Sequence, residues 1–308
     1  MAALSREPQQ PVAIIIVAWN SGEALRAAID SALLQRPEEL VVVDNHSTDN
    51  SVVALRKIYP QVQVVSLASN TGFAAACNIG VASTRARHVL FLNDDAVLDK
   101  DYVHTLLVAL SYKPRAASAV GKLTYQDGAV RRIDSAGLRL DRFALRPTDR
   151  GQGEADVGQY DTPGTVFGPT GAAALYRRSA LEAAGEGGFD AQLFAYYEDV
   201  DLAWRLGNLG YCHLYVPEAQ ATHARRGPFN KPVAIMQRAF VNRYTVWVKN
   251  ESFWRFLLYM PVALAWEAGR IALMLRRDPK STLTTLKAAP RALWRGLKAR
   301  RRLRTYAA

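Results

Sequence analysis

Four short apolar runs, alternating with segments of helical periodicity, occupy the first third of the chain. Runs that are apolar at nearly every position predict strands buried on both faces of a sheet. The short links between strands and helices favour β-α-β units, so the sequence predicts an α/β fold with a doubly wound, mostly parallel sheet. The strand candidates are Val12–Ala18, Leu40–Val43, Gln61–Ser66 and His88–Leu92, and the helix candidates lie at about 22–34, 49–59 and 73–83.

Polar side chains follow each of these strands at the point where it ends. In open parallel sheets, ligands bind beyond the carboxyl ends of the strands, so these side chains mark the candidate site. They are Trp19 and Asn20 after the first strand, Asp44 and Asn45 after the second, Asn70 and Gly72 after the third, and Asp94 and Asp95 after the fourth. Asp44 could hydrogen-bond a nucleobase or ribose, or it could cap the helix that follows.

Asp94 and Asp95 are the strongest local signal. Two carboxylates directly after an apolar strand are costly to bury unpaired. A divalent cation such as Mg²⁺ or Mn²⁺ would neutralise them and would in turn bind a diphosphate. A solvated turn or a helix cap explains the same pair, because Asp99 and Asp101 precede another predicted helix.

A second acidic cluster, Glu198, Asp199 and Asp201, lies at the start of a predicted helix. The positive end of the helix dipole favours acids there, so capping alone could explain one or two of them. Helical spacing does not put all three on one face, so at least one should face a partner or a ligand. One of them would suit a general base, which must be ionised and within reach of an acceptor hydroxyl.

His223 follows the predicted strand at 211–216. A single histidine is more often a surface or core residue than a metal ligand, and this one gains weight only if the fold brings it to Asp94 and Asp95. The sequence has neither a GxGxxG fingerprint nor a GxxxxGK[ST] loop, so it indicates neither a dinucleotide cofactor site nor a P-loop.

The other segments carry less signal. Residues 121–169 are rich in Gly, Asp and Arg and predict loops and short strands, and regular structure is expected again at about 172–176, 179–184 and 199–208. Residues 1–11 form a polar tail without the basic start and apolar run of a signal peptide. Cys77 and Cys212 are expected to be buried, reduced thiols, which favours a cytoplasmic protein.

The positive charge is concentrated at the C-terminal end. The chain has a net charge of +11, and residues 238–308 hold 16 Lys and Arg against three acidic residues. Such a basic segment attracts either an anionic membrane surface or a nucleic acid. Because no nucleic-acid-binding motif accompanies the charge, we expect anionic lipid as the partner and no nucleic acid.

An apolar run, Phe256–Trp266, precedes this basic end. A spanning helix needs about 20 apolar residues. Here Pro261, Glu267 and Arg270 fall within that length. We therefore expect a helix lying in the membrane interface, with a spanning helix and ordinary packing on the preceding domain as alternatives.

Several segments, taken together and in order, resemble the inverting glycosyltransferases of family 2, which have a GT-A fold, and within them a bacterial subgroup of rhamnosyltransferase type. The resemblance covers about residues 12–225 and implies a catalytic domain there, followed by a helical, basic, membrane-associating extension over 226–308. The matching segments are IIIVAWNSG at 14–22, VVVDNHSTDNS at 41–51, NTGFAAACNIG at 70–80, VLFLNDDAVL at 89–98 and residues 187–223.

The resemblance implies a role for each matched residue. Asp199 matches the general base, with Glu198 as its neighbour, and Asp95 matches the last acid of a DXD-type metal motif. His223 matches a ligand of the metal or of the diphosphate. The residues implied in nucleotide-sugar binding are Trp19, Asn20, Asp44, Asn45, Asn70, Gly72, Asn78 and Asp94. Asn93-Asp94-Asp95 departs from the Asn-Pro-Asp common in the subgroup, so either carboxylate could hold the metal.

The activity implied is metal-dependent transfer of a sugar, with rhamnose from a thymidine diphosphate donor as the subgroup's commonest case, to a hydroxyl of a lipid-linked cell-surface polysaccharide precursor. The enzyme would then work in the cytoplasm, peripherally at the inner face of the membrane. Two alternatives stay open. A nucleotidyltransferase would need a Gly- and Lys-rich phosphate loop near the N-terminus, which is not found. A catalytically inactive glycan- or nucleotide-binding relative would not need Asp95, Asp199 and His223.

Overall fold

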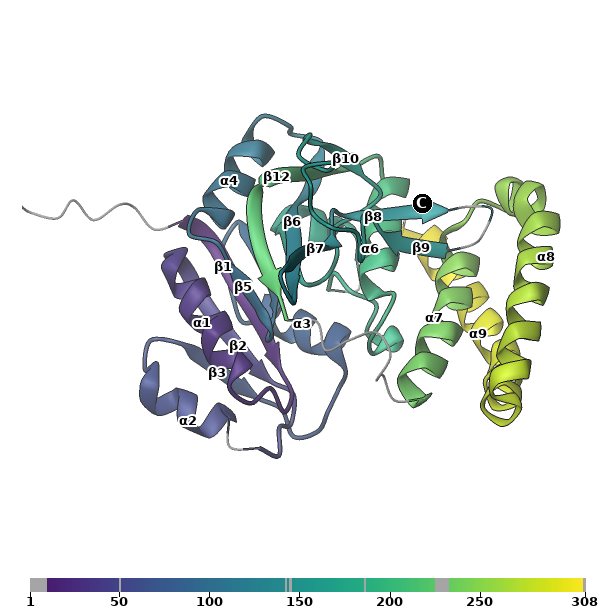
Figure 1. Cartoon of the computed structure of the whole chain (residues 1–308), viewed down its shortest axis with the longest axis horizontal. Helices are drawn as coiled ribbons and strands as arrows, with labels where there is room; N and C mark the ends of the chain where they lie inside the picture. Colours follow the sequence, from purple (N-terminus) through teal and green to yellow (C-terminus); the bar gives the residue numbers. More distant parts are fainter. Residues whose placement is uncertain are drawn as a thin grey trace, which may run out of the picture.

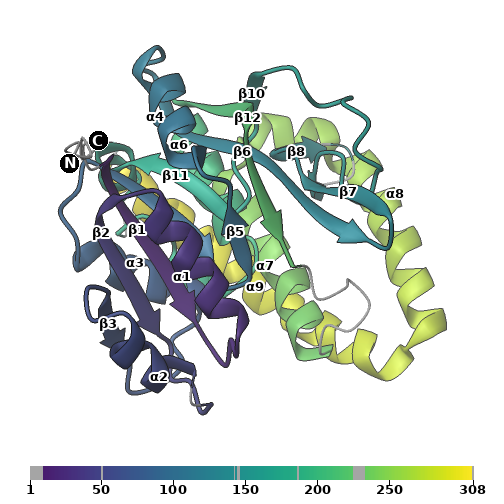
Figure 2. The ribbon, with the colours of Figure 1, turned by 60° about the vertical axis from the view of Figure 1, so that its left-hand side comes forward.

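The computed structural model describes residues 10–49, 51–141, 143, 146–185, 187–224 and 233–306. A mixed sheet flanked by helices is followed by the helices α7, α8 and α9, which lie together at one side of the sheet (Figures 1 and 2). Most of the expected polar tail and the expected boundary between 225 and 226 lie outside the described residues. The first strand begins at Gln10, inside the expected tail.

The first half of the sheet is parallel, as predicted. Strands β3, β2, β1 and β4 lie side by side in that order, and each adjacent pair is parallel. The elements of this half are β1 (Gln10–Ala18), α1 (Ala24–Leu34), β2 (Pro37–Asp44), α2 (Ser51–Ile58), β3 (Gln63–Ser66), α3 (Phe73–Ala82) and β4 (His88–Asn93).

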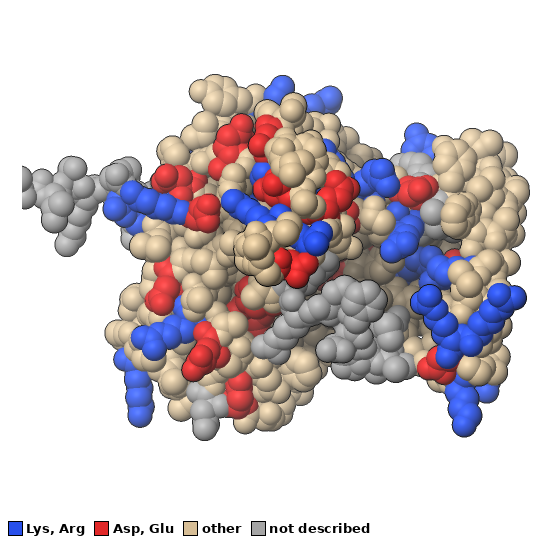
Figure 3. All heavy atoms as spheres, viewed as in Figure 1, with Lys and Arg blue, Asp and Glu red and all other residues tan. Residues whose placement is uncertain are grey.

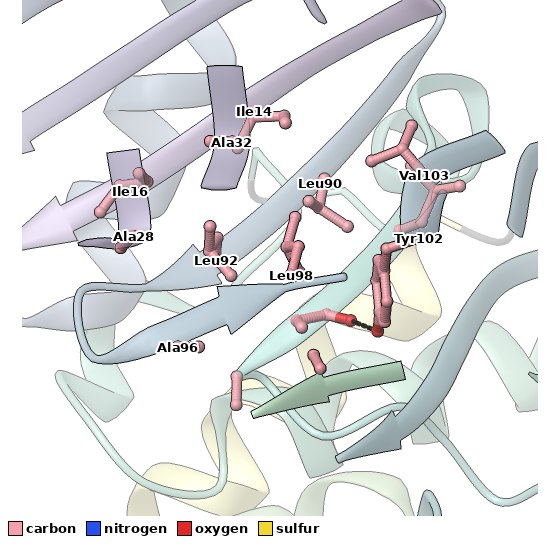
Figure 4. Close-up of a cluster of buried hydrophobic side chains, with 14 of the residues drawn as sticks. Ile14, Ile16, Ala28, Ala32, Leu90, Leu92, Ala96, Leu98, Tyr102 and Val103 are labelled. Atoms are coloured by element: carbon pink, nitrogen blue, oxygen red, sulfur yellow. Dashed lines mark hydrogen bonds between the residues drawn. The ribbon is translucent and has the colours of Figure 1, made fainter. Parts of the chain in front are cut away.

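Both faces of the central strands are buried, which explains their unbroken apolar sequence. Successive side chains of a strand point to opposite faces. Ile14 and Ile16 of β1 belong to the cluster on the face covered by α1, which is drawn in Figure 4. Ile15 and Val17 belong to the second cluster, on the α3 side.

The second half of the sheet is mixed. Strand β11 runs antiparallel to both β4 and β6, and β12 runs parallel to β6. Its elements are β5 (Ala96–Leu98), α4 (Tyr102–Ser111), β6 (Ala116–Asp127), β7 (Val130–Ser135), β8 (Leu138–Asp141), β9 (Arg146–Asp149), β10 (Gly164–Val166), β11 (Ala173–Arg177), α5 (Arg178–Ala183), a 3₁₀ turn η1 (Ala191–Leu193), α6 (Glu198–Asn208) and β12 (Cys212–His223).

Two sequence-based expectations in this half are wrong. Residues 121–127 were expected to start a region of loops and short strands, but they continue β6, which is buried as far as Thr124. The strand expected to end at residue 216 extends to His223, because its second part pairs with β5 and β6. These pairings join segments far apart in sequence, which local periodicity does not reveal.

Helix α7 (Val233–Asn250) is attached to the sheet-containing part of the fold by buried charges. The Lys249 ammonium lies 2.7 Å from Asp190 and 3.1 Å from Asp201, all three side chains being buried. Asp201 also accepts hydrogen bonds from Arg205 at 2.8 Å and from Asn250 at 2.8 Å. The start of the expected extension is therefore packed into the catalytic domain.

Replacing Lys249 tests this attachment. Lys249→Met should lower the free energy of unfolding by about 3 kcal/mol, because it leaves the buried Asp190 carboxylate without a counter-charge and leaves Asp201 with Arg205 as its ion-pair partner. Lys287→Met, at an exposed position, should change it by less than about 0.5 kcal/mol. Urea denaturation followed by tryptophan fluorescence measures both values. Equal stability of the two variants would contradict a structural role for α7.

Helix α8 (Phe253–Arg277) is exposed along almost its whole length, with Ala263 as its one buried residue, and α9 (Pro279–Tyr306) follows it. Exposed apolar residues include Trp254 at 78% and Leu258 at 70%. The outer side of α8 is largely uncharged in Figure 3, and Lys and Arg gather where α8 meets α9. By length and composition α8 could also cross a membrane, which taken alone is weak support for a span.

Candidate functional site

The pairing of β5 with β12 brings Asp95 and His223 together. Ala96 pairs with His223 in this antiparallel ladder, and the amide of Ala224 donates to the carbonyl of Asp95 at 2.9 Å. Asp95 precedes Ala96, so its carboxylate reaches the imidazole, with 3.0 Å between Asp95 Oδ1 and His223 Nε2. The fold therefore brings His223 to Asp95, which was the condition for considering it a candidate site residue.

Asp134, on β7, holds the other side of the His223 ring. Its Oδ2 lies 2.8 Å from His223 Nδ1, and the Asp134 side chain is buried. Although burial opposes the charged imidazole, the hydrogen bonds with Asp134 and Asp95 raise the pKa of His223 to about 9. No sequence pattern pointed to Asp134, because its strand lies in the region expected to be irregular.

Asp199 lies in the first turn of α6 and lines a cavity together with Asp95 and His223. Its carboxylate accepts hydrogen bonds from the amides of Gly171 at 3.1 Å and Val200 at 2.7 Å. This cavity, of about 470 Å³, is lined by Asp94 and Asp95, by Glu198 and Asp199 of the second acidic cluster, and by the His223–Asp134 pair, whereas Asp201 is buried away from it against Arg205 and Lys249. Its charged and titratable lining residues are Asp94, Asp95, Asp134, Asp149, Tyr196, Tyr197, Glu198, Asp199 and His223.

Glu198 and Asp199 differ in their surroundings. Burial and the neighbouring Asp199 charge raise the pKa of Glu198 to about 8, and Glu198 Oε2 is buried with no hydrogen-bond partner among the described residues. Burial also raises the pKa of Asp199, but two backbone amides stabilise its ionised form. A proton shared by the pair therefore belongs on Glu198, which leaves Asp199 as the available base.

A second cavity, of about 650 Å³, adjoins the first and shares Asp94 and Asp95 with it. It lies at the carboxyl ends of β1, β2 and β4, where ligands of open α/β sheets bind. Its lining includes predicted residues from every strand end, namely Trp19, Asn20, Asn45, Asn70, Gly72, Asp94 and Asp95. It also includes Arg238 of α7, which the sequence did not single out and whose guanidinium lies 3.9 Å from the centre of the Phe194 ring.

The loop between the two cavities has an unusual backbone. Phe194, Tyr196 and Tyr197 all have positive φ angles, between 64° and 73°, which non-glycine residues rarely adopt. The Asn242 side-chain amide of α7 holds this loop, with Nδ2 within 2.8 to 3.1 Å of three of its carbonyl oxygens. Gly72 packs directly against this loop. A Cβ added at Gly72 would lie only 2.5 Å from Phe194, so a larger residue would clash there.

Three predicted site residues mainly hold the backbone in place. The Asn20 side chain accepts from the amide of Thr48 at 2.7 Å, and Asp44 accepts from the amide of Ser47 at 2.9 Å. Asn78 was expected in the donor pocket, but both ends of its amide bind the backbone of Phe189, at 2.7 and 3.0 Å. Neither Asp44 nor Asn78 lines the two cavities.

A divalent cation of the Mn²⁺ type would fit between Asp95 and His223 if it replaced the proton that His223 Nε2 shares with Asp95. Two ligands at adjacent corners of an octahedron with bonds of about 2.1 Å lie about 3 Å apart, close to the 3.0 Å between Asp95 Oδ1 and His223 Nε2. Within the described ranges there is no group of three or more His, Cys, Asp and Glu that could hold a metal alone. The remaining ligands would have to come from a bound diphosphate and water.

The family profile of "Glycosyl transferase family 2" matches residues 13–185, more than half of the chain. This chain belongs to that family. The N-acetylglucosaminyl-diphospho-decaprenol L-rhamnosyltransferase of Mycobacterium tuberculosis is 30% identical over 233 residues, which cover 68% of this glycosyltransferase and 75% of the relative. The poly-beta-1,6-N-acetyl-D-glucosamine synthase of Staphylococcus epidermidis is 24% identical over 217 residues, 68% of this chain and 48% of the synthase.

Solved structures of low sequence identity share the fold of this glycosyltransferase. The crystal structure of GalNAc-T7 with UDP, GalNAc and Mn²⁺ has a TM-score of 0.60 at 15% identity, covering 77% of this chain and 48% of that one. Residues 1–349 of S. aureus TarS give a TM-score of 0.53 at 13% identity, covering 92% and 80%. The predicted GT-A fold is confirmed.

Proposed function

We propose that this glycosyltransferase inverts the anomeric centre as it transfers a sugar from a nucleoside-diphosphate sugar to a hydroxyl of a lipid-linked glycan precursor. The observation that carries the proposal is the cavity shared by Asp95, Asp199 and His223. A single displacement requires a base for the acceptor hydroxyl and, in the same cleft, a separate site that stabilises the leaving diphosphate. Asp199 would be the base, and Asp95 and His223 would form the second site. The adjoining cavity at the strand ends is the proposed site of the nucleotide.

The chemical step needs a base on the acceptor side. Asp199 takes the proton of the acceptor hydroxyl as its oxygen attacks the anomeric carbon, and the bond from that carbon to the diphosphate oxygen breaks. The nucleoside diphosphate leaves with the bonding electrons. Glu198 keeps its proton and so does not compete as an anion for the acceptor. One displacement from the face opposite the leaving group inverts the anomeric centre.

Asp95 and His223 are the proposed protein ligands of a divalent cation, with Asp94 at the side. The cation would stabilise the negative charge that develops on the leaving diphosphate. Asp134 orients the imidazole by accepting a hydrogen bond from its Nδ1–H, so that Nε2 faces the proposed cation site. The Mn²⁺ in the GalNAc-T7 structure supports this type of ion.

Asp134→Asn should weaken the binding of Mn²⁺ by about tenfold, because partners that orient a histidine ligand typically contribute 10- to 100-fold in affinity. Electron paramagnetic resonance of free Mn²⁺, in the presence of a nucleoside diphosphate, measures this without turnover. Asp156→Asn is the matched control, since Asp156 is a buried carboxylate paired with Lys122 at 3.0 Å. Equal Mn²⁺ affinity in the two variants would remove the orienting role of Asp134.

The substrates follow by analogy. The mycobacterial relative is named for transfer of L-rhamnose to a diphospho-decaprenol-linked sugar. We therefore propose a deoxyhexose such as rhamnose as the first donor sugar to test, and a sugar on a polyprenyl diphosphate as the acceptor. A panel of nucleotide sugars, screened for slow hydrolysis with and without Mg²⁺ or Mn²⁺, identifies the donor. Hydrolysis of no nucleotide sugar under any condition would count against the whole proposal.

We also propose that α8 and α9 hold the protein at the cytoplasmic face of the membrane. Exposed Trp254, Leu258 and Leu264 offer an apolar surface, and Arg276 and Arg277 at the end of α8 offer positive charge. The protein should sediment with vesicles containing phosphatidylglycerol and much less with neutral vesicles. Equal binding to both, or to neither, would contradict the electrostatic part of this proposal.

A further inference from the structure

A large groove outside the catalytic cleft lies along α8. It encloses about 1030 Å³ between one side of this helix, α7 and strand β9. Its apolar lining comes from α8 alone, namely Pro261, Val262, Ala265, Trp266, Ala272 and Leu273. Its charged lining consists of Arg146, Arg243, Arg270, Arg276 and Glu267. Arginines from β9, α7 and α8 together form a basic wall beside the apolar residues of α8.

The basic wall continues towards the catalytic base. A neighbouring cavity of about 580 Å³ is lined by the same Arg146, Arg243 and Arg270, and it reaches Tyr197. Tyr197 also lines the cavity that contains Asp199. The charges of Arg243, Arg270 and Arg146 act on the Tyr197 hydroxyl, where they oppose the effect of burial on its pKa. The groove thus ends beside the proposed acceptor site.

The basic wall has capacity for an anion. Glu267 is the acid among these arginines, and it binds both Arg243, at 2.6 Å, and Arg270. Arg243 Nε is buried without a hydrogen-bond partner among the described residues. Arg146, on β9, makes no ion pair with any of the described residues. A buried donor without an acceptor is costly, and the oxygens of an anionic ligand would satisfy it.

We propose that this groove binds the lipid diphosphate of the acceptor, with the diphosphate on Arg146, Arg243 and Arg270 and the first isoprenoid units along the apolar side of α8. The inference rests on the proposed transfer to a lipid-linked glycan and names the acceptor site for it. Two adjacent phosphates match the paired donors of guanidinium groups. A sugar attached to that diphosphate would extend past Tyr197 to Asp199.

A phospholipid headgroup is a poorer match. Its single phosphate would need only the outer end of the groove, whereas Arg243 and Arg146 lie on the part that continues to Tyr197. A diphosphate with a hydrocarbon chain uses both walls.

Binding of farnesyl diphosphate to the full chain tests the proposal without any nucleotide sugar. Isothermal titration calorimetry compares it with farnesol, which lacks the anion, and with inorganic pyrophosphate, which lacks the chain. Farnesol and pyrophosphate should both bind more weakly than farnesyl diphosphate. Arg146→Gln and Arg270→Gln should each weaken farnesyl diphosphate binding by about tenfold, the usual effect of losing one charged hydrogen bond. Arg291→Gln and Arg295→Gln, on the exposed side of α9, are the matched controls and should leave it unchanged.

The outcomes separate this proposal from the proposed function. Farnesyl diphosphate binding that is absent, or equal in all four variants, would overturn the acceptor groove. Phosphatidylglycerol binding of equal strength with the same arginine dependence would also overturn it, because the site would then be one for headgroups. Arg146→Gln breaks no ion pair among the described residues and keeps the test valid if the Arg270 variant unfolds. Nucleotide-sugar hydrolysis in the same variants reports on the proposed function independently.

Discussion

Asp199→Asn is expected to reduce sugar transfer by about 1000-fold, within the range typical for loss of a general base. The amide cannot accept the acceptor proton, but it can keep the hydrogen bond from Gly171, which reaches Asp199 Oδ2 at 3.1 Å. The variant should therefore fold normally and still bind the donor. Transfer rates at saturating donor, with circular dichroism and thermal melting, measure both expectations.

The matched control is Asp101→Asn. Asp101 is an exposed acid before α4 whose side chain makes no capping hydrogen bond, so its rate should stay at the wild-type value. Near-normal turnover of Asp199→Asn would exclude Asp199 as the base.

The pH dependence of the wild-type enzyme gives a second test of Asp199. Burial raises the pKa of this carboxyl above its usual range, and the base works only when ionised. Transfer should therefore decline on the acid side at a higher pH than an ordinary aspartate would dictate. A rate that stays constant down to about pH 4, the pKa of an unperturbed aspartate, would contradict this assignment.

Asp95→Ala is expected to abolish metal-dependent transfer, with a loss of at least about 100-fold in Mn²⁺ affinity. A residue that binds the metal directly should matter more than one that orients a ligand, for which 10- to 100-fold is typical. The same variant removes the 3.0 Å contact with His223 Nε2. Mn²⁺ binding by paramagnetic resonance and transfer rates across a range of Mn²⁺ concentrations measure the two effects.

Two comparisons make the Asp95 result specific. Asp134→Asn should show a smaller loss of Mn²⁺ affinity and partial recovery of transfer at high Mn²⁺, whereas Asp95→Ala should recover little. Asp127→Asn, an exposed acid paired with Arg132 at 2.7 Å, should behave like the wild type in both assays. Unchanged Mn²⁺ affinity in Asp95→Ala would move the metal to other residues.

The sequence by itself was sufficient to predict the local features of this protein, namely the first strands and the candidate residues at their ends. Strands β1, β2 and β4 were predictable because strands buried on both faces are apolar at nearly every position. Strand β3 lies at the end of the sheet and is only partly buried. The residues at their carboxyl ends followed from the rule that parallel strands end at one edge. Asp95 could be named in this way, whereas Asp199 came from the acidic cluster at the start of α6 and the role of His223 from the family resemblance. Nothing local in the sequence placed the three in one cavity.

Tertiary structure alone decided how distant segments meet. The pairing of β5 with β12 sets His223 against Asp95, and β7 brings Asp134 behind the ring. Helix α7 falls within the segment that was expected to form a C-terminal extension. Its side chains Asn242 and Lys249 nevertheless contact Tyr196 and Asp190 in the preceding domain. The physical reason is that apolar periodicity reports burial within one segment, whereas pairing register and buried ion pairs depend on partners far along the chain.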